Sequence, residues 1–185
     1  MNKEKIIELL RKSMSDKMPI RIYYHNDPNA YDMMVVGLSS QELFVAREVK
    51  DFDVDGYIVL RTKDIKQISL CEPMLAEILK NEGILNEISS IDESFSTWND
   101  VVAFFIRSKK NVILEIENRN SGAIDFAVGR LAAVDDRYVT VAEFDAEGNW
   151  LADMSRFPLS GIRSVTFDSR YVTIFSKYLG SCPLD

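Results

Sequence analysis

The sequence predicts a mainly β protein with flanking helices (an α+β fold), built from two tandem five-stranded small barrels that are each preceded by an amphipathic helix. The first reason is local, because short runs of alternating apolar and polar residues, rich in β-branched and aromatic side chains, recur between tight turns. The second reason is repetition, because the same order of helix and strands occurs twice. Short strands joined by tight turns are typical of small closed or nearly closed barrels.

The first repeat begins with an amphipathic helix over residues 3–14, in which the apolar side chains form one stripe and the charged side chains lie opposite. A turn is expected over residues 53–56, because Gly56 accepts the positive φ of a tight hairpin. Pro73 suits the start of a short helix over residues 74–81. Strands are expected over residues 20–24, 32–37, 43–49 and 65–68.

The second repeat shows the same parts in the same order. Thr97 and Asp100 have the spacing of a capping box at the start of an amphipathic helix over residues 98–108. Residues 145–149 have the composition of a hairpin turn. Strands are expected over residues 112–117, 124–131, 138–142 and 162–167.

A last helix is expected over residues 169–179, with Asp168 as its N-cap and Gly180 at its end. The opening helices of the two repeats also align, residues 6–13 on residues 101–108, at an offset of 95. Each repeat therefore reads as helix, about five strands and helix. Duplication of one structural unit explains this pattern better than chance.

The polar and acidic residues 85–96 are predicted to be a linker between the two repeats. This boundary divides the chain into a first helix-plus-barrel repeat over residues 1–84 and a second over residues 97–185. Each repeat is expected to fold around its own core.

The charge of the chain disfavours nucleic acid as its general partner. The net charge is −7, of which residues 1–92 carry −4 (12 Lys/Arg against 16 Asp/Glu) and residues 93–185 carry −3 (10 against 13). Binding to a phosphate backbone depends on clustered positive charge. We therefore expect no duplex DNA partner.

The cysteines and the hydropathy pattern predict a cytoplasmic protein without a membrane partner. Cys71 and Cys182 are too few for a disulfide framework and lack the spacing of metal ligands. The N-terminal residues lead into an amphipathic pattern rather than the apolar core of a signal peptide. No apolar run reaches the length of a membrane-spanning helix.

No catalytic or metal-binding site, and hence no cofactor, is expected. His25 is the only histidine, which excludes a histidine-based triad and a multi-histidine metal site. Residues 51–56 imitate the D-x-D-x-D-G start of an EF-hand loop, but Thr62 occupies the position of the bidentate glutamate, which favours an acidic hairpin tip. The acids Asp135-Asp136 and Asp145 with Glu147 lie in turns, where they usually meet water. An enzyme of unknown class is the last alternative, because no P-loop, nucleophile elbow or Rossmann glycine pattern occurs.

The second repeat contains two short motifs that resemble those of the Sm-like (LSm) family. Gly129-Arg130-Leu131 followed by Asp135 and Tyr138 is similar to the first motif, and Leu159-Ser160-Gly161 is similar to the second. The resemblance implies a helix packed on a bent five-stranded barrel, an architecture shared with the wider SH3-like class. It also implies assembly through strand edges. Val139 and Ser160 replace the RNA-contacting asparagine and arginine of that family, which speaks against uridine binding.

The leading functional hypothesis is a non-enzymatic interaction or scaffold protein, acting through contacts with protein partners or by self-association. Single-stranded RNA binding is the alternative, because one local basic cluster lies beside aromatic residues suited to base stacking. The same cluster also has an explanation that needs no RNA. Positive side chains at the C-terminal end of a helix stabilise the helix, because they lie near the negative end of its dipole. The candidate RNA-contacting residues are Arg107, Lys109, Lys110 and Arg119 of the cluster, with Asp135 and Tyr138 of the first motif.

Overall fold

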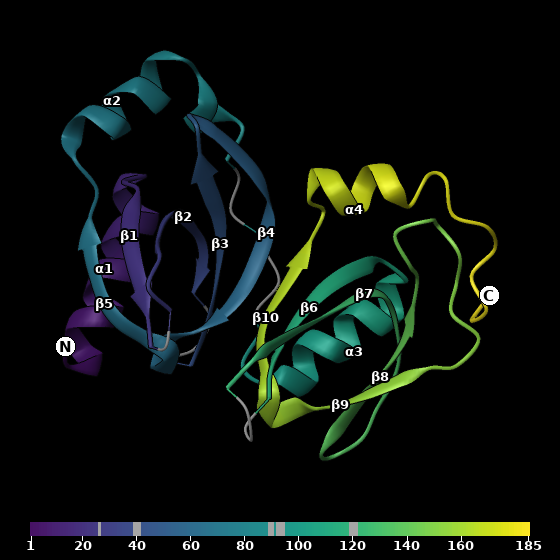
Figure 1. The fold of residues 1–185 in the computed structure, drawn as a ribbon. Coiled ribbons are helices and arrows are strands. Elements are labelled where there is room, and N and C mark those ends of the chain that lie inside the picture. The colour runs from purple at the N-terminus through teal and green to yellow at the C-terminus, as the bar shows by residue number, and fades with distance from the viewer. Residues whose placement is uncertain (26, 39–41, 89–90, 92–94, 119–121) are drawn as a thin grey trace. The chain divides into compact units, whose positions relative to one another are not determined.

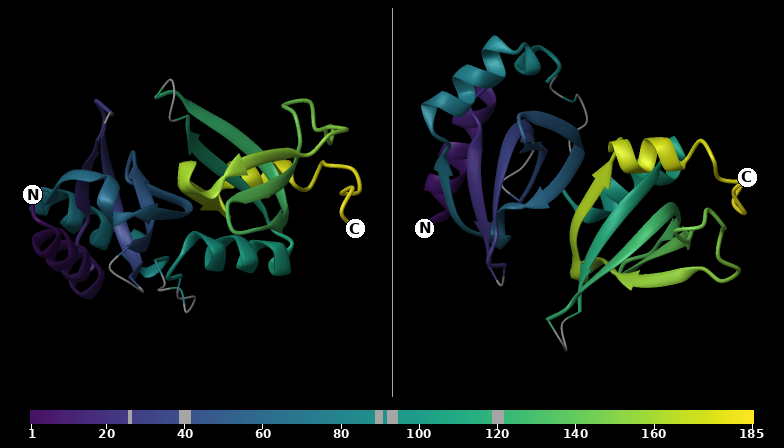
Figure 2. Two further views of the ribbon diagram at one scale, coloured as in Figure 1. Left: turned by 90° about the horizontal axis from the view of Figure 1, so that it is seen from below. Right: turned by 45° about the horizontal axis from the view of Figure 1, so that its top comes forward.

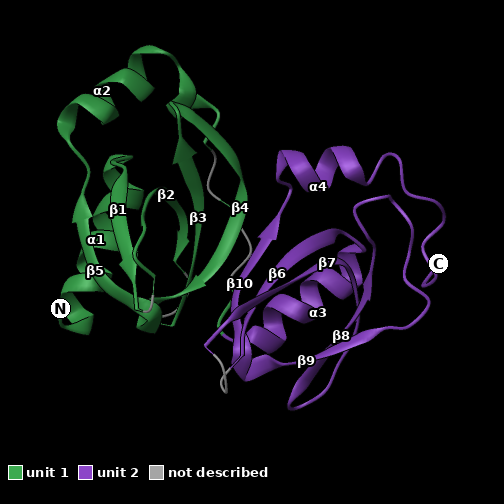
Figure 3. Ribbon diagram, viewed as in Figure 1, with its two compact units in different colours: residues 1–96 green, residues 97–185 purple. Residues whose placement is uncertain are grey.

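The computed structural model describes residues 1–25, 27–38, 42–88, 91, 95–118 and 122–185, and Figures 1 and 2 show it from three directions. The fold is mainly β with flanking helices, as the sequence predicts. The chain divides into two compact units, Met1–Ser96 and Thr97–Asp185, which Figure 3 colours green and purple. All the paired strands are antiparallel.

The first unit contains one helix, five strands and a second helical segment. In chain order these are α1 (Lys3–Asp16), β1 (Ile20–Tyr24), β2 (Ala30–Leu38), β3 (Leu43–Lys50), β4 (Asp53–Arg61), the 3-10 turn η1 (Thr62–Asp64), β5 (Ile65–Leu70), α2 (Pro73–Asn81) and the 3-10 turn η2 (Ile84–Asn86). The strands follow the order β5-β1-β2-β3-β4. Among the described residues, no pairing joins β5 to β4, the first and last strands in this order, so the sheet is open and the expected barrel closure is not confirmed.

The core of the first unit lies between α1 and the sheet, where α1 contacts β2 and β5. Ile6, Ile7 and Leu10 lie on one side of the helix because residues three and four positions apart are neighbours, and all three are buried. Burial of each such side chain contributes about 1.5–3 kcal/mol. Asn2 caps the helix by accepting the backbone N–H of Lys5 at 3.0 Å. The helix predicted here is confirmed.

The turn of the β3–β4 hairpin is not where the sequence predicted it. Residues 53–56 were expected to form the turn, but β4 already begins at Asp53, which pairs with Lys50. The turn residues are Asp51 and Phe52, with φ of 50° and 62°. A two-residue hairpin turn of this kind needs positive φ at both central positions. The register of the strands, rather than the preference of Gly56, decides the position of the turn.

The second unit repeats this arrangement. Its elements are α3 (Trp98–Ser108), β6 (Asn111–Glu117), β7 (Ile124–Val134), β8 (Tyr138–Glu143), β9 (Ser155–Pro158), the 3-10 turn η3 (Leu159–Gly161), β10 (Ile162–Phe167) and α4 (Arg170–Phe175). The strand order β10-β6-β7-β8-β9 matches that of the first unit, strand for strand. In the part of the chain that the structure describes, no pairing closes this order by joining β10 to β9, so barrel closure is not confirmed here either. The capping box of Thr97 and Asp100 is present, as predicted.

The last helix is shorter than predicted. Residues 169–179 were expected to be helical, but α4 spans six residues and then continues as isolated turns. Its N-cap is Ser169, whose side-chain oxygen accepts the N–H of Val172 at 3.3 Å. Asp168, the predicted cap, has a φ of 50°. An N-cap residue requires extended backbone, so the left-handed conformation of Asp168 moves the helix start by one residue.

The segment before the second unit makes several contacts with residues of the first. Arg47 donates from Nη1 to the carbonyl of Glu87 at 3.1 Å, and the backbone N–H of Ile91 donates to Val36 at 3.3 Å. Ile88 is buried. Residues 89–90 and 92–94 of the predicted linker lie outside the described residues.

Candidate interaction surfaces

The predicted basic cluster lies at the C-terminal end of α3, and two of its cations are paired. Lys109 Nζ lies 3.2 Å from Asp185 Oδ1, and Lys110 Nζ lies 2.5 Å from Asp168 Oδ2. Arg107 lies in the last turn of the helix. Exposed pairs of this kind stabilise the fold little. The two ion pairs nevertheless lower the positive electrostatic potential of the cluster. The partner carboxylates, Asp168 and Asp185, were not predicted from the sequence.

Asp135 and Tyr138 lie together at the turn between β7 and β8. Asp135 Oδ1 accepts the backbone N–H groups of Arg137 and Tyr138, each at 2.8 Å, and its other oxygen pairs with Arg156. These bonds hold the pKa of the Asp135 carboxyl below its usual range, with the backbone N–H of Arg137 as the largest cause. The guanidinium carbon of Arg156 lies 4.3 Å from the ring centroid of Tyr138. One stacking face of that ring is therefore covered by a residue that the sequence analysis missed.

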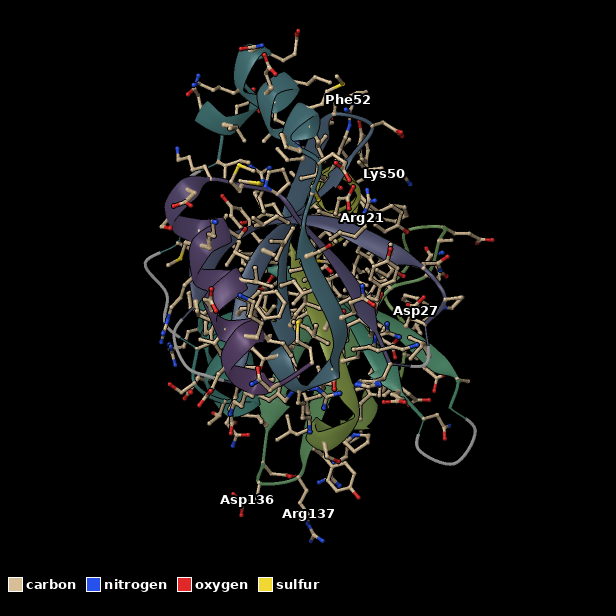
Figure 4. All side chains as sticks on the ribbon, turned by 90° about the vertical axis from the view of Figure 1, so that its left-hand side faces the viewer. Arg21, Asp27, Lys50, Phe52, Asp136 and Arg137 are labelled. Atoms are coloured by element: carbon tan, nitrogen blue, oxygen red, sulfur yellow. The ribbon has the colours of Figure 1, made fainter. Side chains whose placement is uncertain are left out.

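The structure does not bring the predicted RNA-contacting residues into one site. The Asp135 turn lies at one end of β10, where the N–H of Leu159 donates to Arg137 at 2.8 Å, and Figure 4 shows Asp136 and Arg137 projecting there. Lys110 lies at the other end, beside the residue that follows β10. Six extended residues span about 20 Å, so these groups are too far apart to contact one nucleotide. Arg119 lies outside the described residues.

The motif residues of the second unit have structural roles. Val139, which the resemblance to the Sm-like family would align with a base-reading asparagine, has an exposed fraction of 0%. Leu131 is also buried. Gly129 allows β7 to approach β8, because a Cβ at this position would lie 2.8 Å from the Ala142 carbonyl carbon and closer still to its oxygen. These residues serve core packing and the close approach of two strands, and they provide no base-reading group.

The acidic turns considered for acid–base or metal chemistry bind their own backbone. Asp145 Oδ1 accepts the N–H groups of Glu147 and Asn149, each at 2.9 Å. The bond from Asn149 is the largest cause that holds the pKa of this carboxyl below its usual range. The EF-hand imitation lies in the β3–β4 hairpin rather than in a helix-flanked loop. Within the described ranges, no three His, Cys, Asp or Glu side chains are grouped to hold a metal ion.

A charged pair and a buried thiol lie together in the first unit. Arg21 and Asp32 are cross-strand partners on β1 and β2, and two bonds join them, at 2.7 and 2.8 Å. The hydrogen bond from Arg21 lowers the pKa of Asp32. Burial raises the pKa of the Cys71 thiol to about 12. A thiol with this pKa is a poor nucleophile at neutral pH, so this group is structural.

Helix α4 is held firmly against the second unit. Val172 is buried, and the ring of Phe175 stacks on Phe144 with centroids 5.4 Å apart. Trp150 contacts Phe144 edge to face at 5.5 Å. The indole Nε1 of Trp150 also donates to the carbonyl of Gly180 at 3.0 Å. Aromatic packing on one side therefore fixes the orientation of the helix.

Large apolar side chains on α4 and in the turn that follows it remain exposed. Tyr171, Ile174 and Tyr178, which we call the α4 surface, have exposed fractions of 49%, 44% and 82%. Tyr171 and Ile174 lie three positions apart on α4, where neighbouring turns place them near each other, and Tyr178 lies in the turn after the helix. The ring of Tyr171 also stacks on Phe175, with centroids 5.3 Å apart. Arg170 and Lys177 are exposed beside them. This surface was not predicted from the sequence, although apolar residues around a surface helix are a signal that a second contact exists.

No known protein family, curated protein or solved structure matches the chain. Among the helices of the described residues, none is long and apolar enough to cross a membrane. The function must therefore be inferred from the residues of this chain alone, and the α4 surface is one feature of the described residues that the fold leaves unexplained.

Proposed function

We propose that this chain is a non-enzymatic interaction protein, built from two Sm-like units, that binds protein partners through the α4 surface. The observation that carries the proposal is the exposure of Tyr171, Ile174 and Tyr178 on and just after a short helix that aromatic packing anchors through Phe175. Tyrosine is enriched in protein interfaces because it combines a large apolar area with a polar hydroxyl. A helix that is already fixed loses little conformational entropy when a partner binds.

The size of the α4 surface fits binding of moderate strength. Burying a fully exposed large apolar side chain contributes about 1.5–3 kcal/mol. Tyr178 is close to that limit, whereas Tyr171 and Ile174 are already about half buried. Binding energy in protein interfaces is usually concentrated in a few such side chains. A partner that covers all three residues is therefore expected to lose most of its affinity when they are truncated.

Three features support the Sm-like part of the proposal. In both units a helix precedes a five-stranded antiparallel sheet with the same strand order. A 3-10 turn, η1 or η3, precedes the last strand in each unit. The pairing of the second and third strands shifts register at equivalent places, between Val35 and Gly37 and between Leu131 and Ala133. Such irregularities bend a sheet, as a small barrel requires.

Several observations favour a protein partner over RNA. Lys109 and Lys110 pair with carboxylates of their own chain. The side chain of Val139 points into the core, where it cannot contact a base. The net charge of −7 also offers little general affinity for a phosphate backbone.

A photo-crosslinking experiment tests the proposal. In one variant of the full chain, a photoreactive phenylalanine analogue replaces Tyr178. In a second variant of the same chain, the analogue replaces Phe126, which is 64% exposed on β7. We expect protein adducts from position 178 in a cell extract, and none from position 126. The Tyr171→Ala, Ile174→Ala pair should weaken adduct formation at position 178. RNA adducts, or equal protein labelling at both positions, would contradict the proposed role of the α4 surface.

A further inference from the structure

The tip of the β3–β4 hairpin carries an exposed aromatic side chain on an unusual backbone. Phe52 has a φ of 62° and an exposed fraction of 53%. A bulky residue with positive φ is an outlier, and such strained positions cluster at binding sites. Neither the core of the first unit nor a two-residue turn requires phenylalanine here, since glycine or asparagine suits this conformation better.

The same tip is acidic. Asp51, Asp53 and Asp55 are all exposed, and two cations lie beside them: Lys50, and Arg47, which donates to the carbonyls of Val54 and Gly56, each at 3.1 Å. Figure 4 shows Phe52 and Lys50 at the surface of the first unit. We call residues 51–55 the acidic tip. It combines an exposed ring with a local excess of negative charge.

The α4 surface has the complementary chemistry. Residues 169–182 contain no Asp or Glu, although the chain as a whole carries a net charge of −7. Arg170 and Lys177 lie in this stretch and are exposed. Tyr171 and Tyr178 supply aromatic area beside these cations. A partner that fits this surface offers an aromatic side chain flanked by carboxylates, and the acidic tip has that composition.

We propose that the acidic tip of one copy of this chain docks on the α4 surface of a second copy. Phe52 packs against Tyr171 and Tyr178, and the carboxylate of Asp53 lies near Lys177. The charges steer the encounter and select the orientation, while the aromatic contacts supply most of the affinity. This inference rests on the proposed role of the α4 surface, and it identifies the partner as the chain itself.

The contact is heterologous, because two different surfaces meet. Two copies form a closed dimer if both contacts are made at once, whereas one contact per copy leads to larger assemblies. In either case the molecular mass rises with protein concentration. The association should weaken as salt is added, since the charged groups are exposed and are screened.

A charge-exchange experiment tests this inference on the full chain by sedimentation equilibrium. Asp53→Lys and Lys177→Glu each place like charges in the proposed contact, and we expect each protein alone to associate about tenfold more weakly than the original chain. Mixing the two variants brings the lysine introduced at position 53 of one chain against the glutamate introduced at position 177 of the other, so association should recover. Phe52→Ser should also weaken association, whereas Phe126→Ser serves as a matched control without effect. Unchanged circular dichroism and Tm confirm that the variants fold.

The outcomes separate this inference from the proposed function. A monomeric mass at all concentrations, or no recovery in the mixture, overturns docking between copies. If position 178 still crosslinks to a different protein in that case, the α4 surface keeps its proposed role and only the identity of the partner is wrong. If position 178 crosslinks to no protein and the chain is monomeric, both proposals fail.

Discussion

Replacing Gly129 with alanine should destabilise the second unit strongly, although the change adds only one methyl group. Gly129 lies on β7 opposite Glu143 of β8. The new Cβ would lie 2.8 Å from the Ala142 carbonyl carbon and 2.8 Å from the Glu143 Cα. Favourable carbon–carbon contacts begin near about 3.5 Å, so the strands must separate by roughly 0.7 Å or more. Both contacting atoms belong to the backbone, which cannot move aside as a side-chain end does.

The expected loss follows from the cost of overpacking. Such insertions typically cost about 1–3 kcal/mol, and we expect the upper end because the hydrogen bonds between β7 and β8 are strained as well. For a domain of this size, 1 kcal/mol shifts Tm by about 4–8 °C. A loss of about 3 kcal/mol therefore lowers the Tm of the second unit by roughly 12–24 °C.

Tryptophan fluorescence measures this effect selectively, because both tryptophans, Trp98 and Trp150, belong to the second unit. Gly180→Ala is the matched control, since a Cβ there meets no atom within 4 Å. We expect the control to change stability by less than about 0.5 kcal/mol. A Gly129→Ala protein that melts within a few degrees of the original chain would refute the close approach of β7 and β8.

Three further predictions follow from the fold and from the charged groups. Residues 1–96 and 97–185 should each fold when produced separately, with cooperative melting by circular dichroism; a fragment that melts without cooperativity would show a shared core. Oligouridine should bind more weakly than about 1 µM at about 150 mM salt in fluorescence anisotropy; tighter binding that Tyr138→Ala abolishes would favour the RNA alternative. Asp32→Asn should reduce stability at pH 7 by about 1 kcal/mol, allowing for the partial exposure of the pair. Because Arg21 lowers the folded-state pKa of Asp32, the stabilisation by this pair is present above the unfolded-state pKa and is lost as the pH falls through the folded-state pKa. If urea titrations give the same difference in free energy of unfolding between the original chain and Asp32→Asn at pH 7 and at pH 2, this prediction is contradicted.

Much of the local structure can be predicted from the sequence, because it depends on residues close together in the chain. The helix over residues 98–108 and its capping box follow from a four-residue pattern and an apolar stripe. The alternation of apolar and polar residues likewise predicts the position of most strands. The β3–β4 turn was misplaced, because Gly56 is a strong local signal while the pairing of Lys50 with Asp53 depends on the partner strand.

The sequence by itself determined the mainly β class, the repeated order of elements and the apolar residue at position 139. Only the tertiary structure decided which charges meet and which side chains remain exposed. Lys109 and Lys110 find carboxylates 76 and 58 residues away, and no local pattern encodes such a distance. Most residues of α4 are apolar or aromatic, and packing of Phe175 against Phe144 leaves Tyr171 and Ile174 about half exposed. The exposure of a side chain depends on the whole fold, because a residue stays exposed only where no other part of the chain packs against it.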